Sequence, residues 1–197
     1  PAPRRIVSYN TDGSDLQFLT LTAPALDESV FGTLPADHEW HQIIETLLDF
    51  GEAQPRVLRE VIKYGPLDEG YLNPLGGFGY YVCSFDENGV LDEGTPLDFT
   101  PREGWFLNYL CSTPGKLWFK AEQLLGLGET SSLLSFSMED LSLLNTIPLP
   151  EGSSCLDAQG LADGRVVIQL VNPYPSGHGA AFHTSSYRFA IVDPVAG

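Results

Sequence analysis

The stretch from residue 56 to residue 91 constrains the fold most, because two strand-like segments there are joined by a long connection. Residues 57–64 are rich in β-branched side chains and residues 78–85 in aromatic ones, as strands are. Gly-Pro, Asn-Pro and Gly-Gly pairs lie between the two segments, and Asp-Glu-Asn-Gly follows the second, which are turn signals. The stretch predicts a strand, a long loop, a strand and a turn, and it carries no recognisable chemistry.

The composition extends this β pattern to the whole chain. The 197 residues are 43% hydrophobic, enough for a full core, and they contain no run of about 18 apolar residues that could cross a bilayer. The 20 glycines and 15 prolines are spread between apolar runs, which favours short strands joined by turns over disorder. We therefore expect one mainly β domain over residues 1–197, without membrane insertion.

The start of the chain bears on its origin. The sequence begins Pro1-Ala2-Pro3, and its only methionine is Met138. We expect a piece excised from a longer polypeptide or a mature processed chain. No signal peptide is visible, but one removed by processing leaves no trace, so these residues alone leave the localisation open.

The strongly acidic balance limits the partners. A formal net charge of -16 opposes binding to a phosphate backbone or an anionic membrane surface, because such binding relies on clustered Lys and Arg. We therefore expect no nucleic-acid partner. The simplest interpretation of the acidic surface is that it keeps the protein soluble. The two other interpretations are binding to a specific basic partner and mimicry of nucleic acid.

One segment carries a helical pattern. Apolar side chains recur at i, i+3, i+4, i+7 and i+8, namely Trp40, Ile43, Ile44, Leu47 and Leu48. Asp37 is a candidate N-cap and Gly51 a candidate C′ residue. We expect one substantial helix over residues 37–50, with this stripe buried against the β body.

The other apolar segments predict strands. They are residues 6–9, 16–22, 105–111, 117–120, 133–138, 141–147, 165–171 and 185–192. In the last of them Tyr187, Phe189 and Ile191 alternate onto one face. A single helical turn is expected at residues 121–127.

The cysteines and histidines give no metal or catalytic site. Cys83, Cys111 and Cys155 are widely spaced and form no Cys-x-x-Cys pair, so we expect buried apolar residues and no disulfide framework. His38 and His41 could share a helix face with Glu45, but a first-turn His pair without a fourth ligand is more typical of solvent-facing residues. We expect no metal and no cofactor.

Common catalytic devices are also missing. The chain has no P-loop, no Gly-x-Ser-x-Gly and no His-Glu-x-x-His. Carboxylate pairs for glycoside hydrolysis can be assembled on paper from residues 86, 87, 92 and 93, but these lie in turns, where solvated Asp and Glu are expected. A Cys or Ser nucleophile with His178 or His183 has no better support. We expect no enzyme.

The order of these segments resembles a viral jelly-roll capsid module. The resemblance rests on the hydrophobic strand ending Lys63-Tyr64-Gly65-Pro66, on the glycine pair and aromatic strand that follow, and on the final two strands, 165–171 and 187–191, around a Pro/Gly loop. Because the chain is acidic and has no basic arm beyond Arg4-Arg5, it is most similar to the protruding or spike domains of astrovirus, hepatitis E virus and calicivirus capsids. Residues 112–160 match no such pattern, which leaves the strand number open there.

The resemblance implies a jelly-roll-like β-barrel or sandwich on the virion surface, without catalysis. Such a spike domain forms a homodimer, attaches to a host receptor, either a glycan or a protein, and is bound by antibodies. Two alternatives are an extracellular carbohydrate-binding β-sandwich of cellular origin, and an acidic inhibitor or immunity protein that blocks a basic enzyme. A lectin is expected to act as a monomer, and an inhibitor to bind with strong salt dependence.

The loop between the last two strands is the candidate receptor site. It carries Tyr174, His178, Phe182 and His183 among prolines and glycines. Loops on a rigid β scaffold can vary without disturbing the core, aromatic rings can stack on sugars or fill partner pockets, and prolines reduce the entropy lost on binding. A solvated turn without a binding role is the simpler interpretation.

Overall fold

A computed structural model describes residues 5–8, 10, 12–23, 39–48, 56–64, 78–99, 105–123, 131–171 and 187–193. The chain divides into two compact units, Pro1–Leu97 and Asp98–Gly197, and each is described by itself. In the described ranges the regular structure is β, in antiparallel sheets, so the mainly β prediction is confirmed. The single-domain expectation stays a prediction.

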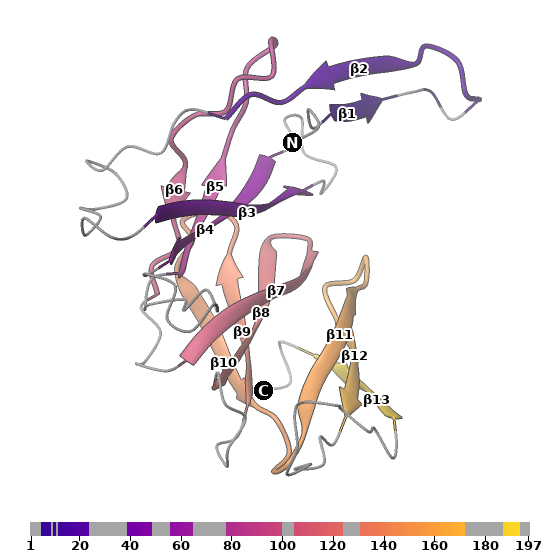
Figure 1. Cartoon of the computed structure of the whole chain (residues 1–197). Helices are drawn as coiled ribbons and strands as arrows, with labels where there is room; N and C mark the ends of the chain where they lie inside the picture. Colours follow the sequence, from indigo (N-terminus) through magenta and orange to yellow (C-terminus); the bar gives the residue numbers. More distant parts are fainter. Residues whose placement is uncertain are drawn as a thin grey trace. The chain divides into compact units, whose positions relative to one another are not determined.

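Unit 1 contains a ribbon and a four-stranded sheet (Figure 1). In the ribbon, β1 (Arg5–Ser8) pairs with β2 (Gln17–Thr20). The sheet has the order β3-β4-β5-β6 and consists of β3 (Glu39–Leu48), β4 (Arg56–Tyr64), β5 (Phe78–Cys83) and β6 (Thr95–Pro96). The strands predicted at residues 57–64 and 78–85 are thus confirmed as neighbours, while the connection between them lies outside the described residues.

The helix predicted at residues 37–50 is wrong, because residues 39–48 form β3, which pairs along its length with β4. The register shifts between Gln42 and Ile44, so one extra residue interrupts the strand there. An inserted residue breaks the period-two alternation and leaves apolar residues at spacings that resemble a helix. Of the predicted stripe, Leu48 is buried and Leu47 is exposed; the side chains of Trp40, Ile43 and Ile44 lie outside the described part.

The core of unit 1 lies around β4. Val57, Leu58 and Val61 are buried there, on both faces of the strand, and Arg59, between them in the sequence, is buried as well. Beyond β5, the predicted turn is present: one Asp86 carboxylate oxygen accepts hydrogen bonds from the backbone N–H groups of Asn88 (2.9 Å) and Val90 (2.8 Å). Gly89 has φ 81°, the left-handed conformation that glycine adopts readily.

Unit 2 contains two antiparallel sheets. The first has the order β10-β9-β8-β7, from β7 (Trp105–Thr113), β8 (Lys116–Gln123), β9 (Ser132–Ser137) and β10 (Leu143–Pro148). The second has the order β11-β12-β13, from β11 (Ser154–Gly160), β12 (Val166–Val171) and β13 (Tyr187–Val192). The helical turn predicted at residues 121–127 is wrong for 121–123, which continue β8. The strand β11 was not predicted.

The two sheets of unit 2 share one core. Trp118 and Leu133 from the first sheet cluster with Cys155, Val166 and Ile168 from the second. The buried Trp118 indole N–H donates to the Thr113 hydroxyl at 3.1 Å, which satisfies a polar group that burial would otherwise leave unpaired. The sheets described are open, with edge strands at both ends of each strand order. Of the expected jelly-roll-like barrel or sandwich, a closed barrel is therefore not observed in this part of the chain.

Candidate functional site

The predicted receptor residues lie outside the described part of the structure. Tyr174, His178, Phe182 and His183 fall within residues 172–186, between β12 and β13. Their grouping in a binding loop stays a prediction. What the structure does describe is the sheet from which that loop departs.

The sheet β11-β12-β13 has two very different faces. On the face called here the inner face, Val166, Ile168 and Leu170 are at most 6% exposed and join the shared core. On the outer face, Tyr187, Phe189 and Ile191 are 54%, 72% and 60% exposed. Three large apolar side chains therefore stand in one row on the surface.

The row follows from the sequence of β13 and from its position. Side chains two residues apart lie on the same face of a strand, and β13 is the edge strand of its sheet. The alternate residues Ala190 and Val192 pack against the shared core. The face predicted for Tyr187, Phe189 and Ile191 is thus confirmed, and it is the face turned away from the core.

The strand register places polar groups beside the most exposed aromatic ring. Phe189 pairs with Gln169 of β12, and Gln169 pairs with Asp157 of β11. Residues paired across a sheet share a face, so a carboxylate, an amide and an aromatic ring form one line across the outer face. In the next line, Ile191 pairs with Val167 and Val167 with Gln159. Exposed aromatic and apolar side chains gathered on one face, with hydrogen-bonding groups beside them, mark an interaction surface.

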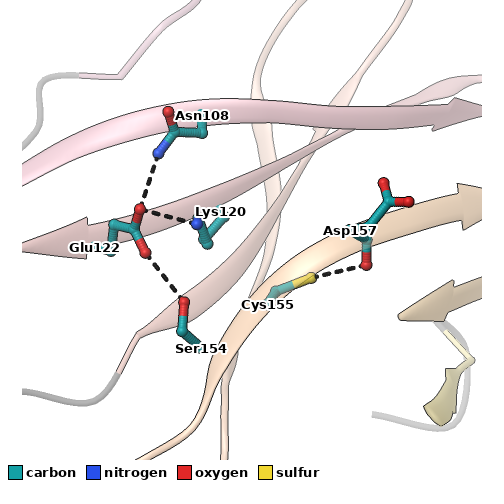
Figure 2. A network of polar contacts seen from close by, with 6 residues as sticks. All are labelled: Asn108, Lys120, Glu122, Ser154, Cys155 and Asp157. Carbon is teal, nitrogen blue, oxygen red and sulfur yellow. Dashed lines mark hydrogen bonds and ion pairs between the residues drawn. The ribbon is translucent and has the colours of Figure 1, made fainter. Parts of the chain in front are cut away.

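A network of polar side chains connects the two sheets of unit 2 near the start of β11 (Figure 2). The Glu122 carboxylate on β8 accepts hydrogen bonds from the Asn108 amide (3.2 Å) and the Ser154 hydroxyl (3.1 Å), and Lys120 Nζ lies 2.8 Å from it. Figure 2 shows the Asp157 carboxylate directed away from this network. Because Glu122 already has these three partners, we interpret the network as a structural tie between β11 and β8.

The thiols of unit 2 are poorly suited to nucleophilic catalysis. Burial is the main cause that raises the pKa of Cys111 to about 12 and that of Cys155 to about 11. The Cys155 thiol donates to the Asp157 carbonyl oxygen at 3.2 Å. A thiol is nucleophilic as the thiolate, and both groups are protonated at neutral pH.

Among the described residues of unit 1, the carboxyl group of Glu60 has a raised pKa. Glu60 of β4 accepts a hydrogen bond from the Tyr80 hydroxyl at 2.9 Å. Burial raises the pKa of Glu60, and the Tyr80 hydrogen bond opposes that shift. A raised carboxyl pKa occurs at catalytic sites, but here the described partner is a single tyrosine on the neighbouring strand, and this pair assembles no catalytic set.

The described residues gather no group of three or more His, Cys, Asp or Glu side chains able to hold a metal ion. The histidine pair that was considered together with Glu45 as a metal set falls outside the described part. His38 and the side chains of His41 and Glu45 are not among the described groups. None of the described residues belongs to a helix long and apolar enough to cross a membrane.

Comparison of the chain with protein-family models, with curated proteins and with solved structures gives no match. The outer-face line of Asp157, Gln169 and Phe189 was not predicted as a site. Its only sequence signal is the alternation in residues 187–191, which identifies a face and not its neighbours.

Proposed function

We propose that the chain is a non-enzymatic attachment module that holds a neutral saccharide on the outer face of the sheet β11-β12-β13. The observation that carries this proposal is the line of Phe189, Gln169 and Asp157 beside two further exposed apolar residues, Tyr187 and Ile191. Contiguous exposed apolar side chains mark interaction surfaces more often than scattered ones do.

The chemistry of a sugar fits this line. The C–H face of a pyranose ring packs on an aromatic ring, and its hydroxyl groups pair with amides and carboxylates. Phe189 supplies the aromatic face, while Gln169 can donate and accept and Asp157 can accept. A neutral sugar also avoids repulsion by a chain with net charge -16, which argues against an anionic one.

The capsid-spike setting is the biological context that we propose for this attachment. It is supported by the mainly β structure and by the final strands β12 and β13, which pair in antiparallel fashion around the loop that carries the predicted receptor residues. In that context the module sits on the virion surface, binds a host glycan and is bound by antibodies. We also propose that the strands are connected as in a jelly roll.

A cellular carbohydrate-binding β-sandwich is the second candidate, because the same outer-face line supports it. The two candidates predict the same sugar contact and differ in assembly, since a spike is expected to be a homodimer and a lectin a monomer. An acidic inhibitor of a basic enzyme predicts instead a tight complex that weakens as salt increases.

A neutral-glycan array tests the proposal with the wild type, Phe189→Ala and Leu143→Ala. Leu143 is the matched control, because it is also an exposed apolar residue of unit 2 but lies on β10. We expect Phe189→Ala to weaken binding by at least about fivefold, equivalent to about 1 kcal/mol, and Leu143→Ala to bind as the wild type does. Melting curves verify that both variants fold. Equal binding by all three proteins would contradict the proposal, as would an absence of glycan binding by the wild type.

A further inference from the structure

We propose that Asn88 is a site of spontaneous deamidation, and that its conversion to isoaspartate releases the end of β2 from the turn that holds it. The site lies in unit 1, in the turn of residues 86–90 between β5 and β6, and it is independent of the proposed saccharide face in unit 2. The reactive pair is Asn88-Gly89, the one place in the sequence where glycine follows asparagine.

Deamidation of an asparagine begins at the backbone nitrogen of the next residue. That nitrogen loses its proton to hydroxide and bonds to the side-chain carbonyl carbon of the asparagine, and the amide nitrogen leaves as ammonia. Water then opens the succinimide at either carbonyl carbon to give aspartate or isoaspartate, so the whole reaction consumes water and releases ammonia. Glycine in the next position favours the attack, because no side chain crowds its nitrogen or restricts its backbone. Asn88 is exposed, so water and hydroxide reach its amide.

The folded turn restrains both reacting groups through Asp86. The Gly89 N–H donates to the Asp86 carbonyl oxygen at 3.0 Å, and the Asn88 amide nitrogen lies 3.5 Å from one Asp86 carboxylate oxygen. The other carboxylate oxygen accepts the backbone N–H groups of Asn88 and Val90, and the Val90 bond is the largest cause that lowers the pKa of Asp86. The Gly89 nitrogen must leave its partner before it can attack, so the reaction proceeds through local opening of the turn.

The same turn holds the segment that follows β2 (Figure 1). The Thr22 N–H donates to the Gly89 carbonyl oxygen at 2.9 Å, and the Leu91 N–H donates to the Thr22 carbonyl oxygen at 3.0 Å. Gly89 also lies so close to β2 that a Cβ atom on it would collide with the Thr20 carbonyl oxygen. The position of the Gly89 backbone therefore decides whether the end of β2 stays bound to the turn.

Isoaspartate changes this position, and aspartate does not. In isoaspartate the main chain runs through the former side chain, which inserts a methylene group between residues 88 and 89. The insertion displaces Gly89, so the hydrogen bond from Thr22 is lost. Both products also add a negative charge beside Asp86 and Glu87, in a chain that already carries -16, but only isoaspartate alters the backbone.

Peptide mapping by mass spectrometry, during incubation of the intact chain in mildly alkaline buffer, tests the site and its restraint. We expect the mass gain of deamidation to appear first in the peptide with Asn88, before those with Asn10, Asn108 or Asn145. The reaction should be faster in denaturant, where the turn is open. Asp86→Ala should accelerate it in the folded chain by about fivefold or more, because charge-assisted hydrogen bonds that oppose opening are lost.

Two further variants keep this test decisive. Asp86→Ser retains a short hydrogen-bond acceptor that suits a turn, so its rate should lie between those of the wild type and Asp86→Ala. Asn88→Gln is the matched control, because the longer side chain forms a cyclic imide much more slowly. Melting curves verify that the variants fold. Absence of reaction at Asn88 would overturn the site, and equal rates in the folded and denatured wild type would overturn the restraint by the turn.

Hydrogen exchange of the Thr22 N–H then tests the release of β2. In aged wild type that contains isoaspartate, this N–H should exchange at least about tenfold faster than in fresh wild type, because its acceptor is displaced. Fresh Asn88→Asp, which carries the charge without the inserted methylene, and aged Asn88→Gln should exchange as fresh wild type does. Unchanged exchange in the isoaspartate form would overturn the release. Equally fast exchange in Asn88→Asp would assign the effect to charge and overturn the role of the backbone insertion.

Discussion

The two faces of the sheet β11-β12-β13 differ sharply in the exposure of their apolar side chains. Ile168 on the inner face is 2% exposed, whereas Ile191 on the outer face is 60% exposed. Both residues are isoleucines in neighbouring strands, so residue type does not explain the difference. What decides it is the parity of each position in its strand. An apolar residue on the outer face is therefore not a core residue and is available for contact with a partner.

Replacement of these two isoleucines gives the largest expected effect. Ile168→Ala should lower the free energy of unfolding by about 2–5 kcal/mol, because it leaves a cavity in a packed core. Ile191→Ala should change it by no more than about 0.5 kcal/mol, as surface substitutions do. Chemical denaturation of both variants measures the difference. Similar losses would show that the outer face is covered in the folded chain, which would remove the contrast and the site with it.

The tie between β11 and β8 should give an intermediate effect. Glu122→Gln should cost about 1–3 kcal/mol of stability, since it removes a charge-assisted contact with Lys120. Ser154→Ala should cost about 1 kcal/mol, because it removes one hydrogen bond. The two changes share the bond between Ser154 and Glu122, so the double variant should lose less than the sum. Strict additivity would show that the sheets are held by the apolar core alone.

The thiols have the smallest effect on stability at neutral pH, where they are protonated in both the folded and the unfolded chain, and they give a clear difference in reactivity. At pH 8 the wild type should react slowly with iodoacetamide, because the pKa values of Cys111 and Cys155 are about 12 and about 11, and Phe189→Cys should react quickly. The thiols of the unfolded chain ionise at lower pH than those of the folded chain, because folding raises their pKa values. The free energy of unfolding should therefore fall as the pH rises from 9 toward 11. Fast labelling of the wild type at pH 8 would place its thiols at the surface.

Much of the fold could be predicted from the sequence where apolar and polar residues alternate along a strand or where the strand is wholly apolar. Residues 165–171 and 185–192 led directly to β12 and β13, and residues 133–138 led to β9. The prediction failed at β3, where the register shift near Ile43 disguises a strand as a helical stripe. It also missed β11, whose sequence Ser-Cys-Leu-Asp-Ala-Gln-Gly contains too few β-forming residues to indicate a strand on propensity alone.

The candidate site was less predictable than the fold. Tyr187, Phe189 and Ile191 could be assigned to one face, but their neighbours depend on which residues the register brings opposite them. The pairing of Asp157 with Gln169 follows a register shift between Cys155 and Asp157. Without that shift Leu156 would pair with Gln169, and Asp157 would pair with Ile168 on the inner face. Local sequence does not specify such a shift, because pairing with β12 decides it.

The close approach of Gly160 to β7 limits what evolution or design can change in this unit. A Cβ atom at Gly160 would collide with the Ser112 carbonyl oxygen and press on the Thr113 methyl group. Any side chain there would have to push β11 and β7 apart, and backbone atoms cannot swing aside as a flexible side chain can. In a saturation library selected for folding, position 160 should therefore accept glycine alone, whereas position 191 on the same sheet should accept most amino acids.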